Sequence, residues 1–259
     1  MSIILKLEHL HKDFGGVVAV NDFSFEINEG QIVAIIGPNG AGKTTIYNLI
    51  SKVNEPDEGT IIFNDVDITD NNQIEIARMG ISRTFQNTRL FTGLNVLDNV
   101  KVALDFDGKY SMLEALLLMP RRWKQEKETT IKATKCLELL NLDQYATFRP
   151  ANLPYGIQRR VEIARALVGN PKVLMLDEPA AGLNPEEVDQ LANFIRDIKR
   201  EYPQLAIMII EHRMDFVMDL SDYIYVQDFG KTIAHGRPEE IQSNPLVLNA
   251  YLGEEGICD

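Results

Sequence analysis

Apolar residues occur along the chain in short, largely β-branched runs, which are typical of strands. The run 31–36 stands directly before a glycine-rich segment and predicts a buried parallel strand. Near the N-terminus, turn residues separate the runs 3–7, 17–20, 23–27 and 60–63, which predicts an antiparallel sheet. Later runs predict strands over 81–86, 172–178 and 206–210, and a hairpin formed by 223–227 and 231–234.

Three stretches carry helical signals instead. Apolar residues recur at steps of three and four from 96 to about 140, a helix over 159–168 follows a turn-rich segment, and an amphipathic helix begins at Pro185. At 259 residues, the chain is long enough for one large domain or for a core with an inserted lobe.

The segment after the run 31–36 fits the phosphate-loop pattern. It consists of Gly37, Pro38, Asn39, Gly40, Ala41, Gly42, Lys43, Thr44 and Thr45, and residues 45–50 can continue it as a helix. Glycines let consecutive backbone N–H groups surround phosphate oxygens, and the start of a helix adds partial positive charge. Lys43 can reach the β- and γ-phosphates, and the Thr44 hydroxyl can ligate magnesium. We therefore expect the chain to bind a nucleoside triphosphate.

Composition excludes several other classes. A net charge of -12 without a strongly basic segment argues against nucleic acid as the main partner. Cys136, a candidate core residue, and Cys258 in the tail support neither a disulfide framework nor a metal site, so we expect a reducing cytosol. The start of the chain lacks the features of a signal peptide, and no apolar run approaches the roughly 20 residues that span a bilayer. Work at a membrane would therefore require a membrane partner.

The predicted strand 172–178 ends in two acids, which narrow the chemistry. Asp177 is placed to hold magnesium, and Glu178 to orient and deprotonate a water that attacks the γ-phosphorus. The alternative is that these acids cap the next helix. Phe14 is a candidate to stack on the base of the nucleotide, although its residue type alone favours packing in the core.

With these motifs in this order, the sequence resembles the ATP-binding cassette ATPases over essentially the whole chain. In that family, Phe14 matches the aromatic residue that stacks on adenine, Gln86 the glutamine that senses magnesium and the attacking water, and His212 the switch histidine that contacts the γ-phosphate. Residues 153–160 match the signature motif and 181–184 the loop at the dimer contact. Asp177 and Glu178 match the magnesium-binding acid and the catalytic glutamate. The other three histidines have no motif around them, and we expect them at the surface.

The resemblance implies an α/β fold. It has a P-loop NTPase core with a mixed parallel sheet, an antiparallel β subdomain and an inserted α-helical lobe. We expect one nucleotide-binding domain over 1–259, with core and β subdomain in about 1–86 and 172–259. The lobe, about 87–171, carries the signature motif.

The signature motif departs from the family pattern Leu-Ser-Gly-Gly-Gln. Pro154 replaces the serine whose hydroxyl contacts the γ-phosphate of a nucleotide on the opposite subunit, and Ile157 ends the motif. Tyr155, Gly156 and the start of the following helix remain candidates to bind phosphate. Asn184 and Arg213 each replace a usual aspartate.

Further features resemble a branch of the family, the ATPase subunits of branched-chain amino acid importers. They are the segments 83–91, 159–165, 178–185 and 244–253 and the extra length between 100 and 130. A lipopolysaccharide-export ATPase shares several of them and is the alternative. Two other functions fit the motifs of this sequence less well: a soluble cassette ATPase, and a nucleotide switch or small-molecule kinase.

The resemblance also implies partners. Each ATP lies between one subunit's phosphate loop and the other's signature, so we expect a dimer, and two different ATPases are favoured. ATP and Mg²⁺ are the expected ligands. Integral membrane permease subunits, and indirectly a substrate-binding protein, are the expected partners, with the chain peripheral at the cytoplasmic face of the cell membrane. Leu90, Phe91 and 96–100 resemble the site where permease helices dock, although they could equally be core residues of the lobe.

Overall fold

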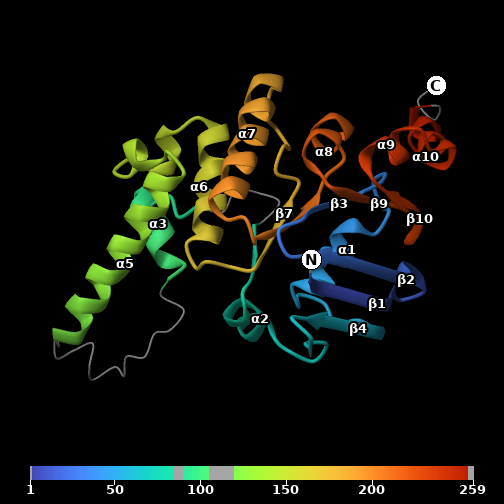
Figure 1. Ribbon diagram of the computed structural model, residues 1–259, viewed down its shortest axis with the longest axis horizontal. Coiled ribbons are helices and arrows are strands. Elements are labelled where there is room, and N and C mark those ends of the chain that lie inside the picture. Colours follow the sequence, from blue (N-terminus) through green and yellow to red (C-terminus); the bar gives the residue numbers. More distant parts are fainter. Residues whose placement is uncertain (1, 85–89, 105–119, 256–259) are drawn as a thin grey trace. The chain divides into compact units, whose positions relative to one another are not determined.

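The computed structural model of the protein describes residues 2–84, 90–104 and 120–255 (Figure 1). Two compact units make up the chain. The larger combines Met1–Gln86 with Lys172–Asp259, and the smaller is Asn87–Pro171. The larger unit contains both sheets, and the described part of the smaller unit is helical.

The larger unit contains a six-stranded sheet with the order β10-β9-β3-β8-β7-β6. Its strands are β3 (Ile32–Ile36), β6 (Ile81–Arg83), β7 (Val173–Asp177), β8 (Ala206–Ile210), β9 (Tyr223–Asp228) and β10 (Lys231–Gly236). All neighbours pair in parallel except β9 and β10, which form the expected hairpin. Every residue of β3, β7 and β8 is buried. Because parallel strands share one carboxyl edge, the segments that follow β3, β7, β8 and β9 emerge along the same edge of the sheet.

The smaller unit is inserted between two neighbouring strands of this sheet. In the pairing of β6 with β7, Ile81 lies opposite Val173 and Arg83 opposite Met175. The chain leaves the larger unit after β6 and returns to it just before β7. Both covalent connections to the smaller unit therefore run through adjacent strands.

A second, antiparallel sheet has the order β2-β1-β4-β5. Its strands are β1 (Ile3–Phe14), β2 (Val17–Asn28), β4 (Glu58–Phe63) and β5 (Val66–Asp67). The runs predicted separately over 17–20 and 23–27 form the single strand β2. Asp22 continues that strand with a φ of 56°, and shifts in register keep it paired with β1. Sequence turn signals divided it because such bulges are not visible as apolar runs.

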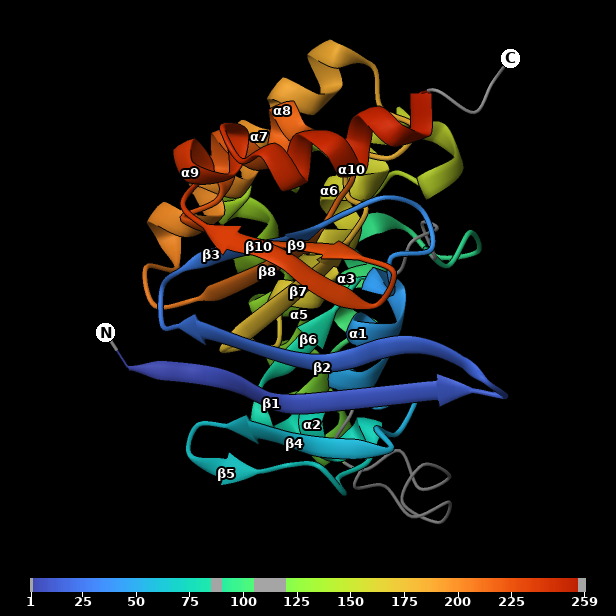
Figure 2. The ribbon, with the colours of Figure 1, turned by 90° about the vertical axis from the view of Figure 1, so that its right-hand side faces the viewer.

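The core of the larger unit joins the two sheets and α1 (Lys43–Ile50). Phe23 and Phe63 of the antiparallel sheet and Ile46 of α1 are buried within it, together with Met175 and Met208 of the six-stranded sheet. Helix α2 is Gln73–Met79. Figure 2 shows α7 (Pro185–Glu201), α8 (Met214–Leu220), α9 (Pro238–Gln242) and α10 (Pro245–Glu255) on the side of the six-stranded sheet that faces away from β1 and β2. The amphipathic helix predicted from Pro185 is confirmed, since its apolar positions are buried in α7.

The smaller unit contains α3 (Val96–Val102), α5 (Pro120–Leu139) and α6 (Tyr155–Leu167), and the single turns η2 (Asp143–Tyr145) and η3 (Pro150–Asn152). Cys136 packs in its interior, where burial raises the pKa of the thiol to about 12, so its prediction as a core residue is confirmed. Cys258 lies outside the described residues. Among the helices that the structure describes, none combines the length and apolarity needed to cross a membrane.

Candidate nucleotide-binding site

The phosphate loop joins the end of β3 to α1 in a conformation that requires glycine. Gly37 has a φ of 151° and Gly42 a φ of 96°. A Cβ atom at Gly37 would lie 2.1 Å from the Gln227 carbonyl oxygen, and one at Gly42 would lie 2.2 Å from the Ala19 carbonyl oxygen. Neighbouring backbone therefore occupies the space that any side chain at these two positions would need.

Lys43 lies within this loop rather than in solvent. Its residue is 6% exposed, and its ammonium donates hydrogen bonds to the carbonyl oxygens of Gly37 at 2.6 Å and Pro38 at 2.8 Å. The next residue, Thr44, is exposed, and Thr45 is half-buried. One cation and two hydroxyl groups thus lie at the first turn of α1, where backbone N–H groups and the helix dipole also favour an anion.

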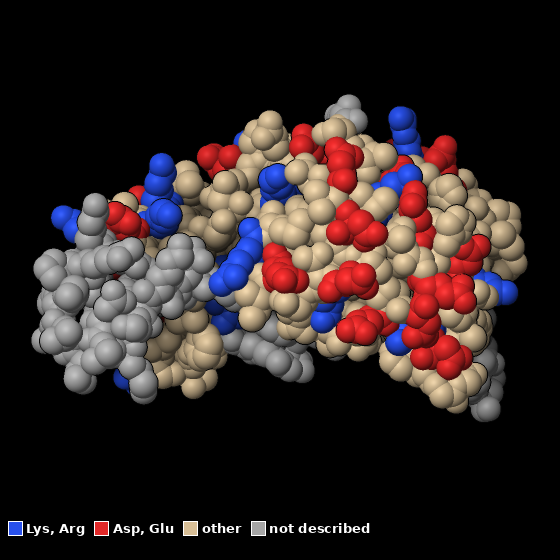
Figure 3. Space-filling view, turned by 90° about the horizontal axis from the view of Figure 1, so that it is seen from below, with Lys and Arg blue, Asp and Glu red and all other residues tan. Residues whose placement is uncertain are grey.

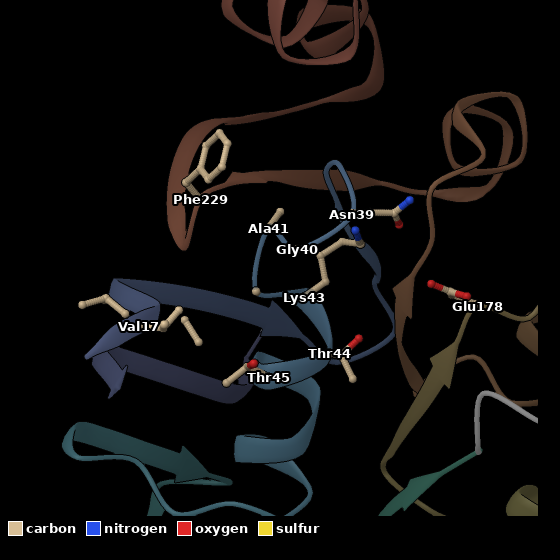
Figure 4. A pocket seen from close by; sticks show the side chains of 12 residues that line it. Val17, Asn39, Gly40, Ala41, Lys43, Thr44, Thr45, Glu178 and Phe229 are labelled. Atoms are coloured by element: carbon tan, nitrogen blue, oxygen red, sulfur yellow. The ribbon is translucent and has the colours of Figure 1, made fainter. Parts of the chain in front are cut away.

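A cavity of about 390 Å³ opens over the loop (Figure 4). It is lined by Val17, Val18, Ala19, Asn39, Gly40, Ala41, Gly42, Lys43, Thr44, Thr45, Glu178 and Phe229. The lining joins the end of the antiparallel sheet, the phosphate loop, the segment after β7 and the β9–β10 turn. Its volume lies within the ordinary range for small-molecule sites, roughly 300–1,000 Å³.

Phe229 lines this cavity but was not predicted from the sequence as a site residue, and the same holds for Val17, Val18 and Ala19. It is 86% exposed, has a φ of 43° and stands on the β9–β10 turn beside the loop (Figure 4). The turn is held there because Gly230 N–H donates to the Ala41 carbonyl oxygen at 3.1 Å. The sequence showed a hairpin at this position, but only the pairing of β9 with β3 brings the turn next to the phosphate loop.

Phe14 is not among the residues that line the cavity. It is 48% exposed at the end of β1, so the interpretation as a core residue is wrong, and its ring lies 5.4 Å from the Lys12 ammonium. Its assignment as the residue that stacks on the base stays a prediction.

The two acids lie at the carboxyl edge of the sheet, where β7 ends. Asp177 is 6% exposed, and its N–H donates to the Thr84 hydroxyl at 3.3 Å. Glu178 has a φ of 43°, which is strained for a residue with a side chain, and its carboxylate points toward the phosphate loop (Figure 4). The alternative that these acids cap the next helix is wrong, because the Asn184 side chain caps α7.

His212 follows β8 and lies beside Glu178. Its Nδ1 atom is 4.0 Å from the Glu178 Oε1 atom, and its side chain is 51% exposed. Of the other histidines, His9 and His235 are exposed, as expected, and His11 is half-buried. The structure therefore brings Lys43, Thr44 and Glu178 together around one cavity, with His212 beside Glu178 and Asp177 directly before it in the chain. Gln86 lies outside the described residues.

The signature segment belongs to the smaller unit and starts α6. The helix begins at Tyr155 rather than at residue 159, because the N–H groups of Ile157 and Gln158 already donate to the Pro154 carbonyl oxygen. Tyr155 is 38% exposed, and Gly156 is half-buried in the first turn. Among the described residues, no side chain caps the start of this helix, and the N–H groups of a helix's first turn have the chemistry to bind an anion.

The donors in the larger unit fit a magnesium nucleotide. The Thr44 hydroxyl and the Asp177 carboxylate are oxygen ligands of the kind that Mg²⁺ takes together with phosphate oxygens. Acidic side chains are spread over the face of the larger unit shown in Figure 3. The cation of Lys43 and the N–H groups at the start of α1 mark the loop as the part of the site suited to phosphate.

Comparison with known protein families identifies the same cassette. Residues 20–181 match the family model described as ABC transporter. Residues 231–257 match a second model, described as branched-chain amino acid ATP-binding cassette transporter.

Individual proteins resemble the chain over almost their whole length. It is 44% identical over 251 residues to the high-affinity branched-chain amino acid transport ATP-binding protein LivG of Salmonella typhimurium, which covers 97% of this chain and 98% of the relative. It is 42% identical to the corresponding BraF protein of Pseudomonas aeruginosa, with the same coverage.

Solved structures agree with the fold. A nucleotide-free ATP-binding cassette from an ABC transporter superposes with a TM-score of 0.84 at 35% identity, covering 96% of this chain and 99% of that one. A cassette in its ADP conformation superposes with a TM-score of 0.83 at 34% identity, covering 98% and 100%. The expected α/β fold with a P-loop NTPase core is thereby confirmed.

Proposed function

This chain belongs to the ABC transporter family, as an ATP-binding cassette that hydrolyses ATP, and on that premise we propose that it powers import of branched-chain amino acids. The observation that carries the substrate class is the match of its C-terminal segment 231–257 to the branched-chain amino acid model, together with relatives of that named function over the full chain. The substrate itself is expected to contact the permease rather than this chain.

In the proposed site, Lys43 and the N–H groups at the start of α1 bind the β- and γ-phosphates. The Lys43 ammonium already lies in the loop at 2.6 Å from the Gly37 carbonyl oxygen, so little ordering is needed when phosphate binds. The Thr44 hydroxyl and the Asp177 carboxylate, with Gln86, would hold Mg²⁺. When bound, Mg²⁺ neutralises charge on the phosphate oxygens.

Glu178 is the proposed general base. Its carboxylate accepts a proton from a water molecule while the water oxygen forms a bond to the γ-phosphorus, and the bond from that phosphorus to the bridging oxygen of ADP breaks. His212, 4.0 Å from Glu178 through Nδ1, is placed to contact the γ-phosphate. ADP and phosphate are the products.

An aromatic residue on the β9–β10 turn extends the nucleotide site. Phe229 and Val17 both line the cavity beside the phosphate loop (Figure 4). An aromatic side chain that is 86% exposed in a cavity beside a phosphate loop is suited to cover one face of a purine base. We assign it to the base together with Phe14.

The signature helix completes the site in the dimer. Tyr155 and Gly156 at the start of α6 are proposed to bind the γ-phosphate held by a partner ATPase subunit. Pro154 supplies neither a hydroxyl nor an N–H, so this contact depends on the backbone of the following turn. The weaker contact of this signature motif with phosphate fits a heterodimer, in which the partner ATPase carries the fuller signature motif.

The proposed contact with the permease centres on Phe91 of the smaller unit. Phe91 is 51% exposed and lies 6.0 Å from the Arg165 guanidinium. The fully buried Asn99 side chain holds its backbone, accepting from Phe91 N–H at 2.7 Å and donating to its carbonyl oxygen at 3.1 Å. An exposed aromatic residue on a fixed backbone is suited to docking. Peripheral attachment at the cytoplasmic face, and coupling to a substrate-binding protein outside, complete the proposal.

The test uses a Glu178→Gln chain, which we expect to bind ATP but to lose hydrolysis by about 10²- to 10⁴-fold. The tagged variant is purified from its host membranes in MgATP, with Glu201→Gln, an exposed acid at the end of α7, as the control. Two permease subunits and a second ATPase should copurify. Near-normal hydrolysis would remove Glu178 as the base, and absence of any membrane partner would overturn the transport proposal.

A further inference from the structure

Glu211, at the end of β8, is a buried acid to which the proposed mechanism assigns no role. Its side chain is 0% exposed, although the adjacent His212 side chain is 51% exposed. A buried carboxylate is unfavourable unless hydrogen bonds compensate for the lost water. The hydrogen bonds of this carboxylate therefore indicate its role in the structure.

Both oxygens of the Glu211 carboxylate accept backbone N–H groups from two separate loops. Oε1 accepts from Ala180 at 2.9 Å, in the loop that follows Glu178. Oε2 accepts from His212 at 2.8 Å and from Arg213 at 3.2 Å. Hydrogen bonds to an ionised acceptor are roughly twice as strong as neutral ones, so this side chain is a firm link between the two loops.

The backbone of Glu211 adds a third connection. Its N–H donates to the carbonyl oxygen of Ile35 at 3.3 Å, and Ile35 belongs to β3, the strand that enters the phosphate loop. One residue thus contacts the strand before the phosphate loop, the loop after Glu178 and the segment of His212. All three belong to the larger unit.

The loop after Glu178 needs such an anchor. Glu178 has a φ of 43°, and this strained conformation persists only where the surroundings fix it. Two backbone hydrogen bonds hold the turn: Glu178 N–H donates to the Ile210 carbonyl oxygen at 2.8 Å, and Ala181 N–H to the Glu178 carbonyl oxygen at 3.1 Å. The bond from Ala180 to the Glu211 carboxylate adds a buried side-chain contact between this turn and the segment carrying His212, beside the exposed contact of His212 with Glu178.

We propose that Glu211 is a positioning residue that fixes the Glu178 carboxylate and the His212 imidazole relative to each other, by holding the backbone of both loops on a single carboxylate. The inference rests on the proposed roles of Glu178 and His212 in hydrolysis. It predicts that loss of the link lowers the rate of the chemical step and leaves ATP binding at the phosphate loop intact.

The test compares Glu211→Gln with Asp222→Asn in the full-length chain. Glu211→Gln keeps the size of the side chain but turns an N–H₂ group toward backbone donors. Asp222 supplies a matched control, because its carboxylate accepts from Ile32 N–H at 2.7 Å at the opposite end of β3. Measured quantities are kcat and KM for ATP, the Kd for ATP by fluorescence of a labelled nucleotide, and the melting temperature.

We expect Glu211→Gln to lower kcat by about 10- to 100-fold, the range associated with misplacement of catalytic groups by about 1 Å. The Kd for ATP should stay within about two-fold of the unchanged chain, and Asp222→Asn should keep both values. Equal kcat in Glu211→Gln and the unchanged chain, or a fall in melting temperature without a fall in kcat, would overturn the inference and leave Glu211 a structural residue.

Two further measurements keep the outcomes separable. Hydrogen exchange should accelerate at the Ala180 and His212 amides in Glu211→Gln, because their acceptor is lost. Should that variant not fold, Glu211→Asp keeps the charge but shortens the reach, and the same fall in kcat is expected; unchanged kcat would overturn the inference. Absence of hydrolysis in the unchanged chain would instead count against the proposed function.

Discussion

Helices α1 and α6 both begin without a side-chain cap, whereas Asn72, Asn95 and Asn184 cap α2, α3 and α7. The residues that surround these two uncapped starts differ. Before α1, glycines at positive φ curve the chain around a buried lysine. Before α6 stands Pro154, and the nearby Arg159 guanidinium is engaged by the buried Glu162 carboxylate at 3.1 Å.

The start of α1 has the groups needed to bind phosphate by itself, whereas the start of α6 has only part of them. The start of α1 combines backbone N–H groups, a helix dipole and a cation in one contiguous stretch. The start of α6 offers only the backbone and the dipole. In the proposed dimer, α6 would therefore add to phosphate bound elsewhere but not bind it alone, and substitutions at the two helices should act on different steps.

The largest effect is expected at α1. Lys43→Ala should lower hydrolysis by at least about 100-fold and weaken ATP binding, because a charge donor to the phosphates is removed from a buried position. Lys231→Ala, an exposed lysine of β10, is the control and should change neither quantity. ATP binding is measured by equilibrium binding of labelled ATP, and hydrolysis by the rate of phosphate release. Full binding by Lys43→Ala would contradict the assignment of the loop as the primary site.

An intermediate effect is expected at α6. Gly156→Asp puts a carboxylate where the partner's γ-phosphate is proposed to lie, and should lower hydrolysis about 10-fold while leaving ATP binding by the single chain within about two-fold. An acid in the first turn of a helix interacts favourably with the helix dipole, and the melting temperature of the variant checks that it folds. Gly169→Asp, in open space in the same unit, is the control. Loss of single-chain ATP binding in Gly156→Asp would contradict the division between the two helices.

The smallest effect is expected at the aromatic residues proposed to stack on the base of the nucleotide, which belong to the same unit as α1. Phe229→Ala and Phe14→Ala should each raise the Kd for ATP about 3- to 10-fold, a modest part of the roughly 1–3 kcal/mol of base stacking on an aromatic residue. Val53→Ala, another exposed apolar residue, is the control. A change confined to Phe14→Ala would remove Phe229 from the site, and a change confined to Phe229→Ala would remove Phe14.

The parts of this molecule that the sequence predicted are those encoded in contiguous residues. Strand, glycine loop and helix form one continuous stretch from Ile32 to Ile50, so residue order alone revealed them. Phe229 and Glu211 escaped because their neighbours come from strand pairing: β9 lies beside β3, and the Glu211 carboxylate accepts from Ala180 and His212. No spacing in the sequence contains that information.

Two boundaries predicted from the sequence were wrong, those within β2 and at the start of α6, and each for a local reason. The sequence predicted two strands on either side of Asp22 because polar residues between apolar runs normally mark a turn. In the structure a bulge there keeps β2 paired with β1. Similarly, Pro154 concealed the start of α6 at Tyr155, although proline supplies a carbonyl acceptor as well as any other residue. The roles of Gln86 and Tyr155 remain predictions, as does the role of Gly156, which the Gly156→Asp variant addresses.

The adjacency of β6 and β7 has a consequence for how this chain tolerates change. Topologically, the whole smaller unit is one long loop whose ends are fixed side by side by the pairing of Arg83 with Met175. The entropy lost on closing a loop grows only with the logarithm of its length, about 0.6 kcal/mol for each doubling. As far as closure entropy is concerned, insertions and deletions within that loop therefore change the free energy of pairing β6 with β7 only slightly.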